Sequence, residues 1–249
     1  MMSDFHVIPA VDIKGGKCVR LFQGRLDEET VFQNDPLDAA MRWQDDGAAL
    51  LHVVDLDGAF QGIPVNRELI SGMIERLAVP VQVGGGIRST DDAMAYVEAG
   101  AKRVVVGTGA FIDPDWLFEL SDRLGDSLAV SVDVKDGRVA TGGWLDLTET
   151  TPSVAVEKMA VMGVKRIVYT EVVRDGTLEG PNFKAIEDIA REAPIPVIAS
   201  GGIASVDDIL RIHRMEELGI EGVIVGTALY KGRFSLAEAL FAIKGEGGS

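Results

Sequence analysis

The sequence predicts a single (β/α)8 TIM barrel built from two similar (β/α)4 halves, and three observations support this fold class. Short apolar segments alternate with amphipathic segments along the whole chain. Short motifs of the first half recur in the same order in the second half. The length of 249 residues suits one barrel of this kind. We therefore expect one domain over residues 1–249, with half-repeats at about 5–125 and 126–245.

Eight apolar segments are predicted to be β-strands. They are rich in Val and Ile over most of their length, as expected for parallel strands that are buried on both faces. They cover residues 6–12, 50–55, 79–83, 103–107, 128–134, 166–171, 195–200 and 222–226.

An amphipathic segment follows each of these strands and is predicted to be a helix. This alternation favours parallel strand pairing with right-handed crossovers. The connections at 14–34 and 135–151 are longer than usual, which makes them candidate active-site loops. The predicted helices cover residues 37–46, 66–77, 90–99, 114–124, 152–162, 183–193, 205–218 and 235–243.

Composition limits the classes of partner. The chain has 24 basic and 39 acidic residues, and this net charge of −15 argues against a nucleic-acid surface and against binding to anionic membranes. Small phosphates can still be held by backbone N–H groups at helix starts. Cys18 is the single cysteine, which excludes an internal disulfide. The first residues lack a signal-peptide pattern and no segment reaches membrane-spanning length, so we expect a soluble cytoplasmic protein.

Acidic residues occur at the ends of several predicted strands. Asp12 in IPAVDIK and Asp133 in VSVDVKDG end strands one and five, which face each other across the barrel mouth. Such a pair suits acid–base catalysis, with one carboxyl protonated and the other ionised. Asp55, Thr170 and Glu171 also lie at strand ends. A strand-end acid can instead cap a helix or anchor a loop, so that interpretation stays open for any single one.

Glycine-rich turns follow four predicted strands in two pairs. The turns that contain Gly85 and Gly107 follow strands three and four, and those that contain Gly201 and Gly226 follow strands seven and eight. Glycine lets the backbone approach a phosphate. One such turn can reflect turn geometry alone, but two pairs predict two phosphate pockets and a bisphosphorylated substrate. The candidate residues here are Gly85, Gly86, Gly107, Thr108, Ser200, Gly201, Gly202, Gly226 and Thr227.

Eight motifs between residue 7 and about residue 240 carry a more specific signal: IPAVDIKGGKCVRLFQG, LLHVVDLDGAFQG, VQVGGGIRS, VVVGTGA, GRVATGGW, YTEVVRDGTLEGPNF, SGGI and GVIVGTALYKG. Together they resemble the phosphoribosyl formimino-aminoimidazole-carboxamide ribotide (ProFAR) isomerases of histidine biosynthesis. The resemblance implies an aldose–ketose isomerase that opens the phosphoribosyl aminal and forms the aminoketose PRFAR, an Amadori rearrangement. It also implies a small substrate with a phosphate at each end.

The resemblance assigns roles to individual residues. Asp12 is expected to accept the proton from ribose C2′, and Asp133 to protonate the furanose ring oxygen. Thr170 and Asp175 match positions that support the second carboxylate and the ring-opened substrate, and Gly176 belongs to the same RDGT motif.

Three further residues match family positions in loops. Trp144 is suited to stacking on the imidazole of the substrate, although it could equally anchor its loop as a hydrophobic residue. Arg20 and Arg88 match arginines that meet a phosphate or hold the first long loop, and otherwise they would be solvated.

The three histidines form no metal or nucleophile pattern, and we expect neither a metal nor a cofactor. We interpret His6 and His52 as strand residues and His213 as a residue on a helix surface. The protein is expected to be a monomer.

Three alternatives stay open. The cyclase of the next pathway step resembles CLDVxxGRVVKG in its first strand, where this chain has AVDIKGGKCVRLFQG, so a glutaminase partner is not expected. A bifunctional relative that also isomerises phosphoribosylanthranilate tends to have SGGIRD and RGRGW, where this chain has GGGIRS and VATGGW. A non-catalytic phosphometabolite-binding barrel is the third alternative, and the presence of both Asp12 and Asp133 argues against it.

Overall fold

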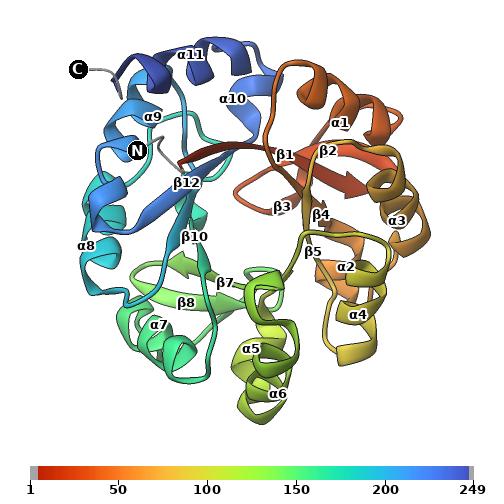
Figure 1. The fold of residues 1–249 in the computed structure, drawn as a ribbon, viewed down its shortest axis with the longest axis vertical. Helices are drawn as coiled ribbons and strands as arrows, with labels where there is room; N and C mark the ends of the chain where they lie inside the picture. Colours follow the sequence, from red (N-terminus) through yellow and green to blue (C-terminus); the bar gives the residue numbers. More distant parts are fainter. Residues whose placement is uncertain (1–4, 247–249) are drawn as a thin grey trace.

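The computed structural model of the chain describes residues 5–246. Within them, eight parallel strands pair in sequence order and close into a barrel, because the last pairs with the first (Figure 1). The predicted (β/α)8 barrel is therefore confirmed. These strands are β1 (His6–Lys14), β4 (Leu51–Asp55), β5 (Val81–Gly84), β6 (Arg103–Val106), β7 (Leu128–Lys135), β10 (Ile167–Glu171), β11 (Val197–Ser200) and β12 (Ile220–Val225).

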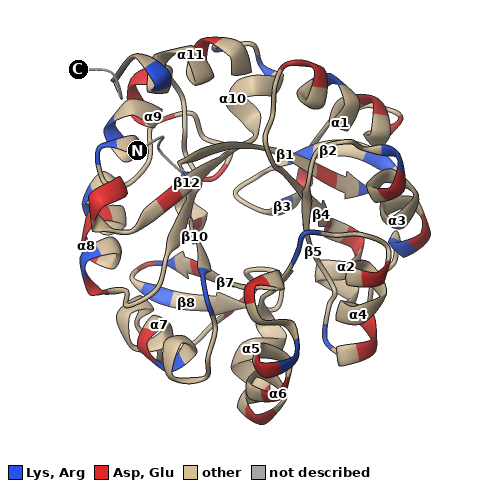
Figure 2. Ribbon diagram, in the orientation of Figure 1, with Lys and Arg blue, Asp and Glu red and all other residues tan. Residues whose placement is uncertain are grey.

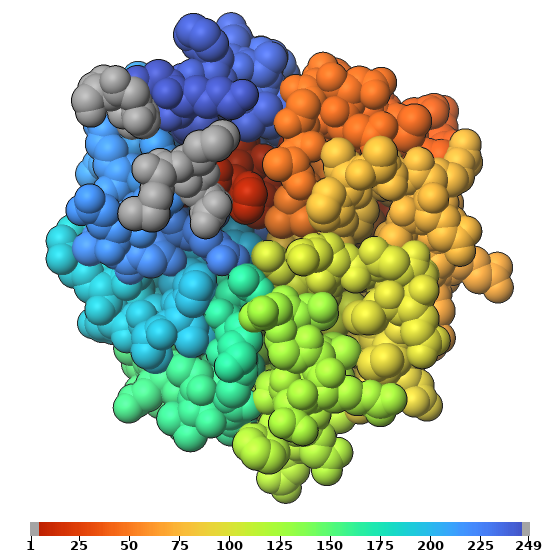
Figure 3. Space-filling model, viewed as in Figure 1, coloured from red at the N-terminus to blue at the C-terminus, as the bar shows by residue number. Residues whose placement is uncertain are grey.

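Longer helices form a ring around the barrel, and the space-filling view shows them packed side by side in sequence order (Figure 3). Local signals fix where they begin: Asp113 caps the Trp116 N–H at 2.9 Å, and Ser205 forms a capping box with Asp208. The helices are α1 (Pro36–Asp45), α3 (Arg67–Arg76), α4 (Thr90–Glu98), α6 (Pro114–Leu124), α7 (Pro152–Val161), α8 (Phe183–Glu192), α9 (Val206–His213) and α11 (Leu236–Glu246).

Several boundaries differ from the sequence prediction. Strands β5 and β11 begin two residues later than predicted, directly after Pro80 and Pro196. Proline has no N–H to donate to a neighbouring strand. The helix predicted at 205–218 is shorter in the structure, because α9 ends at His213. A separate 3-10 turn, η3 (Glu216–Leu218), follows and ends at Gly219, which has φ 100°.

Three short helices escaped prediction because they are shorter than the window in which a helical period can be recognised. They are α2 (Leu56–Gln61), α5 (Thr108–Ile112) and α10 (Thr227–Tyr230), and each directly follows a barrel strand or its turn. Two 3-10 turns, η1 (Gly125–Ser127) and η2 (Val172–Arg174), complete the helical elements of the described residues.

The two long connections contain strands rather than irregular loops. In the first, β2 (Lys17–Phe22) pairs antiparallel with the end of β1 and with β3 (Arg25–Gln33). In the second, β8 (Arg138–Thr141) pairs antiparallel with the end of β7 and with β9 (Asp146–Leu147). Both hairpins therefore project from the carboxyl ends of barrel strands.

Apolar side chains fill two regions. The larger core lies between the barrel and the helices, and a smaller cluster that includes Ala10, Val105, Val168 and Ile224 fills the interior of the barrel. Charged residues gather on the outer helices and loops (Figure 2). Within residues 5–246, no helix is both long enough and apolar enough to cross a membrane.

Candidate active site

Two cavities adjoin each other at the carboxyl ends of the barrel strands. The larger, of about 200 Å³, extends from the interior cluster of the barrel to the turns after β5 and β6. The smaller, of about 20 Å³, lies at the turns after β11 and β12. Arg20, Asp175, Ser200 and Ile224 line both cavities, so the two lie side by side.

Every site residue expected from the sequence lines one of these cavities. The larger cavity is bordered by Asp12, Arg20, Gly85, Gly86, Arg88, Gly107, Thr108, Asp133, Trp144, Thr170, Asp175 and Ser200. The smaller is bordered by Gly176, Gly201, Gly202, Gly226 and Thr227, together with Arg20, Asp175 and Ser200.

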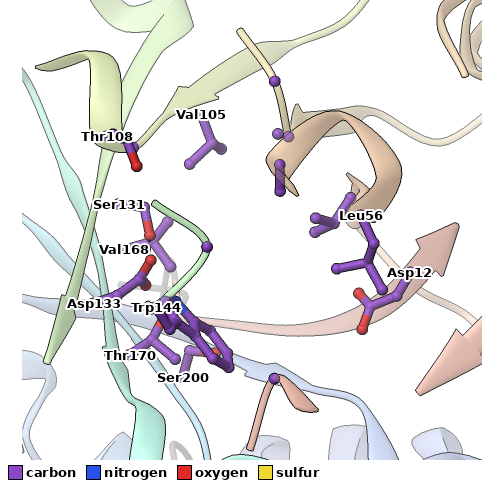
Figure 4. Close-up of a pocket in the computed structure, with 18 of the residues that line it drawn as sticks. Asp12, Leu56, Val105, Thr108, Ser131, Asp133, Trp144, Val168, Thr170 and Ser200 are labelled. Carbon is purple, nitrogen blue, oxygen red and sulfur yellow. Dashed lines mark hydrogen bonds between the residues drawn. The ribbon is translucent and has the colours of Figure 1, made fainter. Parts of the chain in front are cut away.

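Asp12 and Asp133 point into the larger cavity from opposite walls (Figure 4). Asp12 lies where β1 pairs with β2, and Arg20 on β2 donates from Nη1 to Asp12 Oδ2 at 2.7 Å. Arg20 itself is buried. Burial raises the pKa of Asp12, and the Arg20 guanidinium limits this rise because it favours the carboxylate.

Asp133 has no cation beside it and is held by neutral donors. Ser131 Oγ donates to Asp133 Oδ1 at 2.7 Å, and the side chains of Thr170 and Trp144 also hydrogen-bond to this carboxyl. Thr170 on β10 is the register partner of Asp133 on β7, which explains their contact. Burial raises the pKa of Asp133, and the three hydrogen bonds oppose the rise.

Asp175 lies in the turn after η2 and borders both cavities. Burial raises the pKa of this carboxyl to about 6. The guanidinium of Arg20 opposes the rise, whereas the carboxyls of Asp12 and Asp133 add to it. One buried cation thus faces several acids, so part of their negative charge is unpaired.

The two hairpins meet over the larger cavity. Trp144, between β8 and β9, lies on the Asp133 side of the cavity with a backbone φ of 71°, a region that non-glycine residues rarely adopt (Figure 4). Its indole packs on Gly24 of the first hairpin so closely that a Cβ there would lie 2.4 Å from the ring. The Gly142 N–H donates to Thr108 Oγ1 at 2.9 Å and ties the second hairpin to the turn after β6.

The paired glycine turns need glycine for close packing. A Cβ at Gly85 would lie 2.1 Å from the carbonyl oxygen of Asp55, and one at Gly201 would lie 2.8 Å from that of Glu171. Both glycines have φ near 100°, where side chains are disfavoured. The turn after β5 therefore packs directly against the end of β4, and the turn after β11 packs against the end of β10. Both turns line a cavity.

The turns that follow β6 and β12 differ in their surroundings. The Arg20 guanidinium lies on Gly226, where a Cβ would be 1.7 Å from Nη2, whereas a Cβ at Gly107 would meet only Ser131 at 3.9 Å. Thr227 Oγ1 is buried without a hydrogen-bond partner at the smaller cavity. Thr108 Oγ1 at the larger one accepts from Gly142 instead.

Comparison with known proteins assigns the chain to a family. The model of a family described as histidine biosynthesis protein matches residues 6–235. The chain belongs to this histidine biosynthesis family.

Three of the curated relatives that the chain resembles carry the name 1-(5-phosphoribosyl)-5-((5-phosphoribosylamino)methylideneamino)imidazole-4-carboxamide isomerase. The relative from Desulforudis audaxviator is 46% identical over 94% of this chain and 89% of that protein. Those from Moorella thermoacetica and Crocosphaera subtropica are 48% and 44% identical, over 94% and 95% of this chain and 96% and 92% of each relative.

Two other strand-end acids turn out to be structural in this member of the family. Asp55 is fully buried, caps α2 through the Gly58 N–H at 2.8 Å and also accepts from the Val65 N–H at 2.7 Å. Glu171 accepts from Tyr169 Oη at 2.7 Å. Neither acid lines either of the two cavities, and the helix-cap interpretation is confirmed for Asp55, whereas the Glu171 side chain bonds within its own strand and caps no helix.

Two of the three histidines lie where the sequence predicts them. His6 and His52 lie in strands as predicted, but His52 also lines the larger cavity, which sequence reasoning missed. Strand alternation could have indicated this position. Leu51 and Val53 point toward the helices as core residues, so His52 between them points to the opposite face, into the barrel. The surface position predicted for His213 is wrong, since this ring is 8% exposed and packs 4.9 Å from Phe5. Within residues 5–246, no three His, Cys, Asp or Glu side chains are grouped to hold a metal.

Proposed function

We propose that this protein isomerises ProFAR, a bisphosphorylated aminoaldose, to the aminoketose PRFAR by acid–base catalysis. The observation that carries the proposal is the pair Asp12 and Asp133 on opposite walls of the larger cavity, which borders one pair of glycine turns and adjoins the smaller cavity at the other pair. A ribose ring placed between the carboxyls would have one acid near its C2′ and the other near its ring oxygen. The names of the relatives support this substrate.

The surroundings of the two carboxyls support different roles. The ion pair with Arg20 favours ionised Asp12, as required of the group that takes the C2′ proton. Burial raises the pKa of both carboxyls, but Asp133 has no neighbouring cation that opposes the rise, as suits the group that protonates the ring oxygen. The bond between C1′ and the ring oxygen then breaks with its electrons on that oxygen, and Asp12 takes the C2′ proton to give an enolamine. Loss of the 2′-hydroxyl proton and addition of a proton at C1′ give the aminoketose. Thr170 and Asp175 support Asp133 and the opened substrate.

Each pair of glycine turns is proposed to bind one phosphate. At the larger cavity the groups are Gly85, Gly86, Gly107, Thr108 and Arg88; at the smaller they are Gly176, Ser200, Gly201, Gly202, Gly226 and Thr227. The unpartnered, buried Thr227 hydroxyl supports an acceptor-rich ligand beside it. Trp144 is proposed to stack on the imidazole between the two ends.

We also propose that the enzyme works in the cytoplasm as a monomer and without a cofactor. Both carboxyls and both glycine-turn pairs come from one chain, which supports a site that is complete in a single subunit. A sedimentation measurement at assay concentration would contradict this if the active species were a dimer.

The test is a turnover assay of the purified protein on ProFAR and, separately, on phosphoribosylanthranilate. We expect turnover of ProFAR alone; turnover of both would favour the bifunctional alternative, and turnover of neither would favour a binding protein.

Asp12→Asn and Asp133→Asn should each lower kcat by 10² to 10⁴, on the order of 3 to 5 kcal/mol, with the fold intact. Exposed Asp136, in the turn that follows β7, provides the matched control Asp136→Asn, which should retain full activity. A variant at Asp12 or Asp133 that retained more than about a tenth of kcat would contradict that residue's role.

A further inference from the structure

His52 faces the larger cavity but has no part in the chemistry proposed above. Its strand partner on β1 is Ala10, whereas Asp12 pairs with Val54. The imidazole therefore lies one inward-facing position deeper in the barrel than the Asp12 carboxyl, and it is half-buried because one side borders the cavity.

A chain of polar side chains runs from this imidazole across the barrel interior. Gln82 on β5 is fully buried, and its Nε2 lies 3.0 Å from His52 Nδ1. Arg103 Nη1 donates to Gln82 Oε1 at 3.1 Å. Arg103 in turn pairs with Glu221 at 3.6 Å, and Glu221 also holds Arg166 at 2.8 Å.

This chain determines which ring nitrogen of His52 carries the proton. A guanidinium can only donate, so the Gln82 oxygen must face Arg103 and its NH2 group must face His52. His52 Nδ1 must then accept, and the proton of the neutral ring lies on Nε2. No other hydrogen bond of His52 is formed within residues 5–246, so its Nε2–H is free to meet a ligand.

Building on the proposed isomerase function, we propose that His52 is a neutral hydrogen-bond donor to a substrate hydroxyl, and that Gln82 is the positioning residue that fixes its tautomer. Such a donor holds the sugar without competing with Asp12 for its protons, because the Nδ1 lone pair is already occupied by Gln82.

The electrostatics of the site favour the same uncharged state. Burial lowers the pKa of His52 to about 3, and the nearby cations Arg20 and Arg103 contribute to the shift. A second proton on Nδ1 would also point at the Gln82 NH2 group. His52 therefore stays neutral throughout the working range of the enzyme.

The tautomer can be measured without any assay of activity. In protein labelled with ¹⁵N-histidine, long-range ¹H–¹⁵N correlation should show His52 with a bare Nδ1 and a protonated Nε2, unchanged between pH 5 and pH 8. Loss of these signals in His52→Gln would assign them. In Gln82→Glu the carboxylate can only accept, so the His52 proton should move to Nδ1 or the ring should become doubly protonated. A wild-type Nδ1–H tautomer, or titration of His52 in this range, would overturn the proposal.

Kinetics test the contact with substrate. His52→Ala should lower kcat/KM for ProFAR about 10- to 100-fold, the loss expected when a substrate oxygen is left unpaired. His52→Gln places an NH2 group near the position of Nε2 and should restore most of the loss, whereas His52→Asn places it near Nδ1 and should not. The control is His6→Gln, because His6 also lies in a barrel strand but lines neither cavity.

The outcomes distinguish a failure of the proposed isomerase function from a failure of the proposed role of His52. If wild-type protein does not turn over ProFAR while the Nε2–H tautomer is observed, the proposed function fails and the polar chain stands. If ProFAR is turned over but His52→Ala stays within twofold of wild type, the role of His52 is wrong. If His52→Ala does not fold, His52→Gln and His52→Asn test the role of His52, provided that the two variants have the same thermal stability. Equal kcat/KM in both would overturn the proposal.

Discussion

At the scale of single residues, the site concentrates buried acid around one buried cation. Arg20 pairs with Asp12 at 2.7 Å and also interacts with Asp175, and both acids raise its pKa against the effect of burial. Asp175 has no comparable partner of its own, and its pKa is raised to about 6. The fold therefore tolerates an energetic cost of keeping the Asp175 carboxyl ionised at neutral pH.

This cost predicts a pH-dependent gain in stability for Asp175→Asn. The folded-state pKa of about 6 exceeds the unfolded value of about 3.9, so the folded protein binds more protons between these values and loses stability as the pH rises through them. Above pH 6 the full penalty applies, with an upper limit of about 3 kcal/mol. The variant avoids it, so its Tm should exceed that of the wild type at pH 8 and approach it at pH 4.

Thermal unfolding at pH 4, 6 and 8 measures this effect. Asp136→Asn, which changes an exposed carboxyl, is the control and should show no such trend. A Tm difference for Asp175→Asn that is the same at all three pH values would show that Asp175 carries no raised pKa.

At the scale of elements, two hairpins and one turn converge on the cavity from different strands. Gln23, at the tip of the first hairpin, donates its N–H to the Asp175 carbonyl at 3.1 Å and its side-chain amide to the Val173 carbonyl at 2.7 Å. Trp144 of the second hairpin packs on Gly24. The hairpins thus hold each other as well as the site, and we predict that both close over the bound substrate.

Trp144→Ala should weaken binding of the imidazole-bearing product by roughly 1 to 3 kcal/mol, the range for stacking of a base on an aromatic ring. Calorimetric titration with PRFAR measures this, and Trp144→Phe should keep most of the affinity. Fluorescence of Trp144 should change on saturation, after subtraction of the Trp43 and Trp116 signals in Trp144→Phe. Unchanged affinity in the alanine variant would leave Trp144 with a structural role alone.

The glycines of the turns after β6 and β12, Gly107 and Gly226, should respond differently to the same change. Gly226→Ala places a Cβ 1.7 Å from Arg20 Nη2 and must displace the guanidinium from Asp12, so kcat should fall and KM should rise. Gly107→Ala meets only Ser131 at 3.9 Å and leaves Arg20 in place, so its loss of kcat should be much smaller. Steady-state kinetics of the two variants provides the test, and an equal loss of kcat in both would contradict the coupling of Gly226 to Asp12 through Arg20.

At the scale of the whole molecule, the site spans the barrel mouth from the turns after β5 and β6 to those after β11 and β12. These strand pairs lie on different sides of the closed sheet, with β1 and β4 between them in one direction and β7 and β10 in the other. A ligand anchored at both ends must therefore pass between Asp12 on β1 and Asp133 on β7.

The two-pocket arrangement predicts that a ribotide with one phosphate binds far less tightly than PRFAR. Loss of several hydrogen bonds to a charged group should cost at least about 3 kcal/mol, or more than 100-fold in Kd. Turnover of a one-phosphate substrate analogue should fall in kcat as well as in KM, because remote binding energy positions the reacting carbon. Added inorganic phosphate should restore part of the loss. Equal turnover of the fragment and of ProFAR would disprove the second phosphate pocket.

The sequence alone determined the barrel and most of the proposed site. Short, doubly buried strands carry their own signature in runs of Val and Ile, and strand ends fall at predictable positions, so Asp12, Asp133 and the glycine turns could be located before any contact was known. The division of the molecule into two half-repeats and the roles of these residues stay predictions.

Only the tertiary structure decided which chemically capable residues share a space. It placed Arg20 between Asp12 and Gly226, gave Asp55 to the α2 cap and buried His213. It also connected His52 to Gln82. Each of these contacts joins different elements, and its existence depends on strand register and barrel closure. Local sequence patterns specify the conformation of a segment, whereas the neighbours of a side chain depend on how distant segments pack.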